Sequence, residues 1–448
     1  MTGDRSLLSR LHRLGGLDFH VLTTLLLRSW QIVAGGVMIL FLPVWLTKVA
    51  QGYYYTFASL VALAVFFELG LHVVVTQLVG HERAHLTFGL DGALSGDPRH
   101  LDRLASLARL LRRWYRVASA LFFLGVGAAG LLFFSRNPAL PPREWVAPWL
   151  LLVAAASGIL YFSPILAFVE GLGRVGQVAR MRAIFSVLGY LAMWTALSLG
   201  GSLWSVWILP AITVAGTAYW LLRHDRALPG LAARPVAPAT ERIRWREEIL
   251  PLQWRIGVTW ASNYVILNLF TPVIFAHQGA VEAGRVGLAF SVFNAVQLLG
   301  MSWIHARTPT LTALVASGDR TALNRTFRAA TARSTVFVLA AATGIVLAVW
   351  GLRVLGLPIA ARIADLPVLA CIGTVSVANT LIYAASTYMR AHKREPTLVT
   401  SAVGAVLIGS MILLVTPHGI LPAMILYVLV TVGVLLTWTG LIFRKHYR

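Results

Sequence analysis

The chain has 448 residues, of which 58% are apolar and only 12% charged, a composition too apolar for a soluble protein of this size. In a soluble protein the formal net charge of +21 would suggest nucleic-acid binding. Here the basic residues lie between long apolar segments, so membrane topology explains them better and no nucleic-acid partner is expected. One cysteine, Cys371, excludes a disulfide framework and a zinc-type motif.

Continuous apolar segments of about 18 or more residues predict membrane-spanning helices. We therefore predict an all-α polytopic membrane protein with about twelve transmembrane helices. The first two spans are expected to meet at a short turn around Gln51 and Gly52. The predicted spans are 21–46, 53–79, 117–135, 146–168, 183–200, 203–222, 256–276, 286–305, 335–355, 366–387, 398–416 and 420–442.

The basic residues support this number of spans. With a cytoplasmic N-terminus, 31 of the 38 lysine and arginine residues fall in inner segments and Arg28 falls within a span. Such a bias follows the positive-inside rule and predicts that both termini are cytoplasmic. The remaining six fall in outer loops: Lys48, Arg136, Arg143, Arg285, Arg353 and Arg362.

The longest polar stretch, 223–255, divides the predicted spans six and six and contains Pro229, Pro235 and Pro238. It predicts a cytoplasmic linker between an N-terminal six-helix bundle, 1–222, and a C-terminal six-helix bundle, 256–448. Similar features at matching places, such as Pro43-Val44 and Pro272-Val273, suggest a duplicated unit, the usual plan of secondary transporters. Chance likeness among apolar segments is the alternative.

Two predicted inner segments, 98–116 and 319–334, have leucines and aromatic residues at helical spacing among arginines. This pattern predicts helices that lie in the headgroup region of the membrane. They either gather an anionic lipid substrate or simply anchor the protein to the anionic cytoplasmic leaflet.

Polar side chains concentrate in the first two predicted spans of each half. Because lipid penalises them, these spans are expected to surround a water-filled path. The candidate substrate-binding residues are Arg28, Gln31, Asn263, Asn268, Asn294 and Gln297. The tenth span adds two further polar residues, Asn379 and Tyr383.

Arg28 lies about two helical turns inside the predicted inner end, where a guanidinium can bind a phosphate or pyrophosphate bidentately. The alternative is that Arg28 reaches back to the inner headgroups. Glu68 is expected to be an ion-pair partner of Arg28, a proton or sodium coupling site, or a structural acceptor. His72, one turn further, titrates near neutrality in its ordinary state but is more often structural as a lone histidine.

The sequence lacks the signatures of an enzyme or a motor. It has no Gly-rich phosphate loop with Lys-Ser/Thr and no clustered metal ligands, and its outer loops are too short for an external catalytic domain. We expect no catalytic residues, no metal and no cofactor, with a proton or sodium ion as the candidate coupling ion.

Three stretches resemble one family. Gly52–Leu60 followed by Phe67–Leu71 is similar to the first-to-second helix signature of the Wzx-type polysaccharide flippases. Glu170–Arg174 and Arg390–Pro396 are similar to inner turns of such proteins, which belong to the multidrug/oligosaccharidyl-lipid/polysaccharide (MOP) exporter superfamily.

The resemblance implies two six-helix bundles that alternate between inward-open and outward-open states. It also implies a bacterial cytoplasmic-membrane protein that moves an undecaprenyl-pyrophosphate-linked oligosaccharide to the outer leaflet in O-antigen or other polysaccharide biosynthesis. Membrane lipids and the polysaccharide polymerase machinery are the implied partners. Drug exporters and peptidoglycan-precursor flippases of the superfamily, and less readily a membrane enzyme of polysaccharide assembly, are the alternatives.

Overall fold

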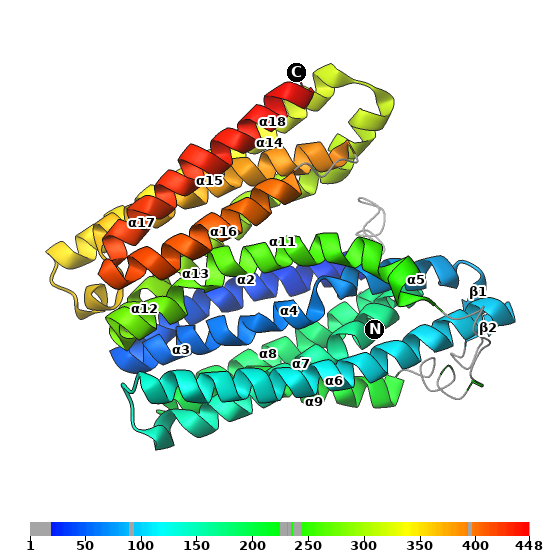
Figure 1. Cartoon of the computed structure of the whole chain (residues 1–448), viewed down its shortest axis with the longest axis horizontal. Coiled ribbons are helices and arrows are strands. Elements are labelled where there is room, and N and C mark those ends of the chain that lie inside the picture. The colour runs from blue at the N-terminus through cyan, green and yellow to red at the C-terminus, as the bar shows by residue number, and fades with distance from the viewer. Residues whose placement is uncertain are drawn as a thin grey trace, which may run out of the picture. The chain divides into compact units, whose positions relative to one another are not determined.

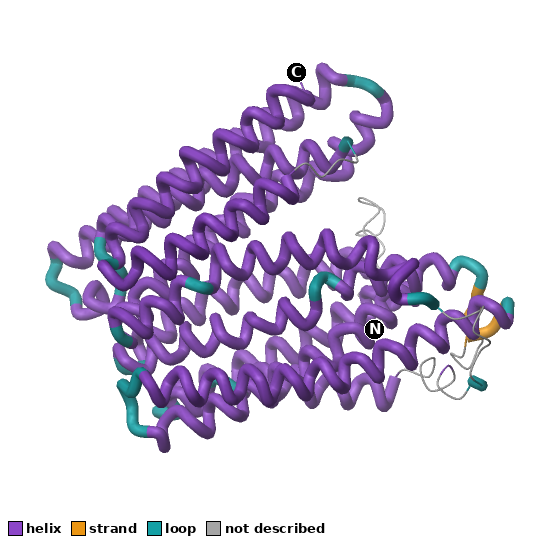
Figure 2. The backbone as a smooth tube through the Cα atoms, in the orientation of Figure 1, coloured by secondary structure: helices purple, strands orange, loops and turns teal. Residues whose placement is uncertain are grey.

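The computed structural model describes residues 19–88, 94–224, 231, 234–235, 243–392 and 397–447, apart from the side chains of 19–26, 28, 224, 252, 397, 446 and 447. Helices make up nearly all of this part (Figures 1 and 2), and they confirm the predicted all-α class. A short antiparallel hairpin, β1 (Leu86–Phe88) and β2 (Leu94–Gly96), pairs Thr87 with Ser95.

The chain forms two compact units. Unit 1 comprises Met1–Gly35, Ala64–Phe133 and Pro142–Gly257, and unit 2 comprises Gly36–Leu63, Phe134–Pro141 and Val258–Arg448. Three helices run from one unit into the other: α2 (Phe19–Trp45), α6 (Pro98–Arg136) and α11 (Leu250–Asn268). The division into bundles 1–222 and 256–448 stays a prediction.

The other helices of unit 1 are mostly single spans or short connecting turns. They are α4 (Val65–Glu68), α5 (Leu71–Arg83), α7 (Pro142–Val169), η2 (Glu170–Arg174), α8 (Val175–Ser198), η3 (Ser202–Ser205), α9 (Ile208–His224) and η5 (Trp245–Ile249), with η1 (Ala62–Ala64) at the boundary.

Unit 2 contains two long helices, α13 and α14, of 38 and 35 residues. Its elements are α3 (Lys48–Val61), α12 (Phe270–Gln278), α13 (Ala280–Ser317), α14 (Arg320–Val354), η6 (Pro358–Arg362), α15 (Leu366–Ala391), α16 (Thr397–Val415), η7 (Thr416–His418), α17 (Ile420–Val428), η8 (Leu429–Leu436) and α18 (Thr437–Tyr447). Helix α15 packs against α13, α14 and α17.

Within the described residues, ten helical stretches are long and apolar enough to cross a membrane, which makes this a multi-pass membrane protein. One of them, Pro142–Ser198, contains two predicted spans, 146–168 and 183–200, because the wide turn η2 joins α7 to α8 without a gap. The first predicted span, 21–46, falls on α2 (Phe19–Trp45). The total of twelve stays a prediction.

The expected turn at Gln51 and Gly52 is wrong, because the chain turns earlier, at Leu46 and Thr47. Thr47 Oγ accepts a hydrogen bond from the Ala50 amide (3.1 Å) and so caps the start of α3. Gly52 instead lies inside α3, where a Cβ atom would stand 1.9 Å from the Ala280 carbonyl oxygen. Only glycine permits this close approach of α3 to α13.

The second predicted span, 53–79, is also not one helix. It breaks between α4 and α5, where Leu69 and Gly70 both adopt left-handed backbone angles (φ 44° and 69°). A Cβ atom on Gly70 would lie 2.1 Å from the Ile256 side chain, so the break is packed closely against α11. An apolar run gives no sign of such a break apart from its glycine.

The two segments expected in the headgroup region are instead the first turns of long helices. Residues 98–116 continue into the span of α6, and Leu104, Leu111 and Tyr115 on their apolar face are buried in the protein. Residues 319–334 begin α14, and Leu323 packs in a cluster with Tyr388. The amphipathic pattern is real, but protein covers the apolar face that lipid was expected to cover.

Candidate functional site

Unit 2 contains a polar pocket of about 180 Å³ lined from α3, α11, α12, α13, α15 and α17. Three predicted substrate-binding residues line it: Asn268, Asn294 and Gln297. Asn379 of α15 lines it too. The three predicted residues thus come from two helices, α11 and α13, and lie around one cavity.

The local structure explains how these amides meet. Asn268 is the last residue of α11, which ends where the chain breaks at Leu269 before α12. Asn294 and Gln297 are three residues apart on α13, so they share one face of that helix. Broken helices with polar groups at the break are a recurring way to build transport sites.

The chemistry of this pocket is neutral. None of the described residues that line it carries a charge, and its other polar members are serine, threonine and tyrosine side chains. Phe290 and Tyr427 add aromatic rings. Amides, hydroxyls and aromatic rings suit a ligand rich in hydroxyl groups and offer no counter-ion to a charged one.

Asn263, a further predicted binding residue, lies elsewhere. It is one turn and a half earlier on α11, its side chain is exposed, and it does not line this pocket.

Unit 1 contains a second polar pocket, of about 410 Å³, lined from α2, α7, α8 and α9. Gln31 lines it, together with Ser163, Arg182, Ser186 and Tyr190. Arg182 is the one charged side chain among the described residues of this lining. Ser186 also accepts a hydrogen bond from Trp30 Nε1 (3.2 Å), which fixes one wall.

Glu68 is held at the edge of this region by a serine. Ser163 Oγ, which lines the unit 1 pocket, donates a hydrogen bond of 2.6 Å to Glu68 Oε1. Glu68 is the last residue of α4, directly before the left-handed break, so the break sets the direction of its carboxylate. Of its three expected roles, the structure places it as an acceptor; Arg28's side chain lies outside the described residues, and no coupling role is tested.

His72 and Arg182 are joined by a carboxylate that the site prediction missed. Glu170 Oε2 lies 3.0 Å from His72 Nε2, and Glu170 Oε1 lies 3.0 Å from Arg182 Nη1. Glu170 is the first residue of the wide turn η2, which Gly173 completes with a φ of 84°. The turn thus holds a largely buried carboxylate between α5 and α8.

Arg182 was missed because it was counted as an inner-loop residue, one position before a predicted span. The structure starts α8 at Val175, so Arg182 lies two turns inside the helix and lines a cavity. A helical projection of 170–190 that placed Arg182, Ser186 and Tyr190 on one face was the signal that could have found it.

Comparison with known proteins shows the fold. No protein-family model matches the sequence, and neither does any curated protein. Among solved structures, an inward-facing multidrug resistance MATE family transporter of the MOP superfamily matches with a TM-score of 0.57 and 14% identity, covering 92% of this chain and 99% of that one. The outward-facing conformation of a multidrug resistance MATE family transporter matches with a TM-score of 0.54 and 13% identity, covering 96% of each.

A third structure differs in its site. It is a MOP superfamily transporter from Pyrococcus furiosus, described by the reverse polarity of its binding pocket, which suggests a different function for that protein. It matches with a TM-score of 0.55 and 13% identity over 95% of this chain and 96% of that one. At such identities these matches show that the chain has a MATE-like fold. They do not distinguish the Wzx-type flippases from other branches.

Proposed function

We propose that this protein is a flippase for lipid-linked oligosaccharide. It moves an undecaprenyl-pyrophosphate-linked glycan from the inner to the outer leaflet of the bacterial cytoplasmic membrane, by alternating access, for polysaccharide or lipopolysaccharide assembly. Both termini are cytoplasmic in this proposal.

The observation that carries the proposal is the neutral amide pocket of unit 2. A sugar presents many hydroxyl groups that donate and accept hydrogen bonds, and Asn268, Asn294 and Gln297 do both through their amides. A cationic drug would favour an acidic pocket, and no described residue of this lining is acidic.

The unit 1 pocket supports the anionic part of the same substrate. Arg182 presents a guanidinium to the pocket next to Gln31, and a pyrophosphate oxygen pair is a strong bidentate partner for it. Glu170 pairs with Arg182 at 3.0 Å, so an anion that binds this guanidinium has to compete with one carboxylate. Arg28, one turn from Gln31 on α2, is the second candidate cation.

Coupling falls in this proposal to two titratable side chains of unit 1. Glu68 and His72 are the candidate proton or sodium sites, because Glu68 accepts a hydrogen bond from Ser163 and His72 lies 3.0 Å from the Glu170 carboxylate.

The test is a flipping assay in proteoliposomes with a fluorescent undecaprenyl-pyrophosphate-linked oligosaccharide. The double variant Asn294→Ala/Gln297→Ala removes two amides from the unit 2 pocket. We expect its initial rate to fall about tenfold, since two lost hydrogen bonds to the sugar cost roughly 1–3 kcal/mol. Gln177→Ala, an exposed amide of α8 outside both pockets, is the matched control and should keep the wild-type rate.

A cationic dye is assayed in parallel, since the drug exporters share the fold. Movement of the dye by wild-type protein, with none of the glycolipid across a panel of glycans and ion gradients, would overturn the proposal in favour of a drug exporter. A double variant that flips the glycolipid at the wild-type rate would remove the amide pocket from the substrate path.

A further inference from the structure

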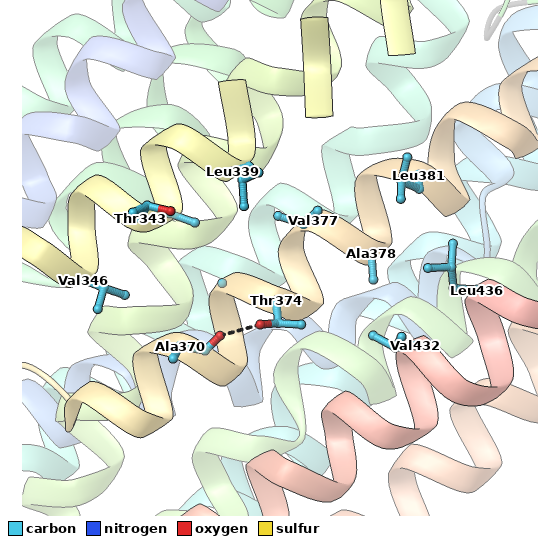
Figure 3. Close-up of a pocket in the computed structure, with 12 residues that line it drawn as sticks. Leu339, Thr343, Val346, Ala370, Thr374, Val377, Ala378, Leu381, Val432 and Leu436 are labelled. Atoms are coloured by element: carbon cyan, nitrogen blue, oxygen red, sulfur yellow. Dashed lines mark hydrogen bonds between the residues drawn. The ribbon is translucent and has the colours of Figure 1, made fainter. Parts of the chain in front are cut away.

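Unit 2 also contains an apolar groove that the proposed function has not used. It has a volume of about 480 Å³ and lies over α15, between α14 and η8 (Figure 3). Helix α15 packs against both neighbours and forms the floor. Leu339, Ala370 and Thr374 on its lining are exposed, so the groove is open at the surface of unit 2.

The lining is almost pure hydrocarbon. Thr343 and Thr374 are the only side chains with a polar atom among the described residues that line it. Thr374 Oγ1 donates to the Ala370 carbonyl oxygen (2.9 Å), so its hydroxyl is used within α15, as Figure 3 shows. Such a lining offers water almost no hydrogen-bond partners, so ordered water is not favoured in the groove.

The groove is also at membrane depth. All three of its helical segments fall inside stretches that are long and apolar enough to span a bilayer: Arg320–Val354, Leu366–Ala391 and Ile420–Lys445. An open apolar groove in that position is filled by a hydrocarbon chain, since neither water nor polar protein groups compete for it.

Two features distinguish the lining of the groove. Its floor is made of small residues, Ala370, Gly373 and Ala378, which leave room along α15. One wall, with Val432 and Leu436, is the eight-residue π-helix η8. Such wide turns are rare and recur at functional sites.

Two faces of α15 line two different environments, one polar and one apolar, over the same turns of the helix. Ile372, Ser376 and Asn379 line the amide pocket, while Gly373, Thr374 and Val377 line the groove. These sets interleave along the same turns of one helix. A ligand with a polar head and a long apolar chain meets both environments in unit 2.

We propose that the α15 groove binds the polyprenyl chain of the lipid-linked substrate. This inference rests on the proposed function, because a flippase has to keep the chain in an apolar environment while the glycan crosses. The ligand proposed for the groove is thus a long, methyl-branched hydrocarbon attached to a phosphate.

The experiment is photo-crosslinking in nanodiscs with a polyprenyl phosphate that carries a diazirine in its chain, followed by mass spectrometry of the labelled peptides. We expect labelling on α14, α15 and η8 that an excess of unlabelled polyprenyl phosphate removes and an equal excess of diacyl phospholipid does not. Thr374→Trp fills the groove from an exposed position, and labelling there should fall roughly tenfold, or about 1.4 kcal/mol of binding. Val406→Trp, on the exposed face of α16 outside the groove, is the matched control and should label as wild type.

Labelling that phospholipid competes away equally would overturn the inference, because the groove would then hold ordinary membrane lipid. So would labelling that Thr374→Trp leaves unchanged in correctly folded protein. The two proposals fail separately. Glycolipid flipping without groove labelling removes the groove alone, whereas specific groove labelling in a protein that flips no glycolipid keeps the chain site and removes the flippase.

Discussion

Glu170 is the residue on which the unit 1 site depends most directly. It is 12% exposed and is held by His72 and Arg182 at 3.0 Å each, so its charge is compensated from two helices. Glu170→Gln keeps the size of the side chain but leaves Arg182 without its counter-ion. We expect it to lower the free energy of unfolding by about 1–2 kcal/mol, allowing for the partial exposure of Arg182. Thermal unfolding in detergent measures this.

The matched control is Glu144→Gln, an exposed acid in the first turn of α7, the helix that precedes η2, and it should change stability by no more than about 0.5 kcal/mol. The double variant Glu170→Gln/Arg182→Gln should recover part of the loss, because it removes the unpaired cation. Strictly additive single and double effects would show that the two side chains do not interact.

Among the residues in and around the two pockets, the amide side chains could be identified from the sequence, whereas the paired charged side chains could not. Asn268, Asn294 and Gln297 were identifiable because neutral polar groups inside apolar runs are conspicuous. Arg182 and Glu170 were not, because both fall in a stretch that reads as an ordinary basic inner loop. Their pairing depends on a wide turn at η2 that no local pattern predicts.

The break between α4 and α5 is an element-scale feature that one glycine maintains. Gly70 has a φ of 69°, and a Cβ atom there would meet Ile256 at 2.1 Å. Gly70→Ala should therefore destabilise the protein by about 1–3 kcal/mol and more where Ile256 cannot move. Gly344→Ala is the control: this glycine lies inside α14 with open space around it, and the change should stabilise by about 0.5–1 kcal/mol. Equal unfolding temperatures for the two variants would show that the break carries no strain.

A cluster on α5 and α6 gives the protein an acid-sensitive contact. Glu82 is buried and accepts hydrogen bonds from His100 Nδ1 (2.7 Å) and Arg103 Nε (2.8 Å), while Glu248 also pairs with Arg103. Burial alone would raise the pKa of Glu82, but the bonds from Arg103 and His100 outweigh it and hold the pKa below its ordinary value.

Because the pKa of Glu82 is lowered in the folded state, its stabilisation is complete above the ordinary glutamate pKa of about 4.3 and is lost as the pH falls through the lowered value. We expect Glu82→Gln to cost about 1–3 kcal/mol near neutral pH. The difference in unfolding temperature from wild type should shrink below about pH 4. A difference that stays constant down to pH 3 would contradict the assignment to Glu82.

Helices were predictable from the sequence where the length of an apolar run determines the element. They were not predictable where packing against other parts of the protein determines it. The long spans of α13, α14 and α15 follow from continuous apolar runs. The start of α6 was assigned to the membrane surface because an amphipathic pattern is the same whether lipid or protein covers its apolar face. Contacts such as the hydrogen bond from the Ile243 amide to Ser106 Oγ, far away in the sequence, decide which one does.

On the scale of the whole molecule, three basic residues of the predicted outer loops are held by contacts within the protein. In unit 2, Arg285 donates to the Ala361 carbonyl (3.0 Å), Arg353 pairs with Asp365 (2.8 Å), and Arg362 donates to the Leu46 carbonyl. These arginines have structural roles at that end of the unit. The excess of basic residues in the predicted inner segments is the part of the charge bias that predicts orientation.

The orientation itself is tested by cysteine accessibility in intact cells. Cys371 is the only native cysteine, so Cys371→Ser supplies a background into which single reporters are introduced. Ser317→Cys, exposed at the end of α13, lies at a predicted inner end, and Ser135→Cys, exposed at the end of α6, lies at a predicted outer end. Both changes replace serine at an exposed position, so neither should disturb folding.

A membrane-impermeant maleimide should label Ser135→Cys in intact cells and Ser317→Cys only after the membrane is opened. The reason is electrostatic: 31 basic residues on the inner side resist translocation against the membrane potential, whereas only six lie on the other side. The reverse pattern would place the protein upside down and reverse the direction of transport. Labelling of both sites in intact cells would place them on the same side of the membrane. That result needs an even number of spans between them, whereas five are predicted, from 146–168 to 286–305. The twelve-span topology would then have to be redrawn.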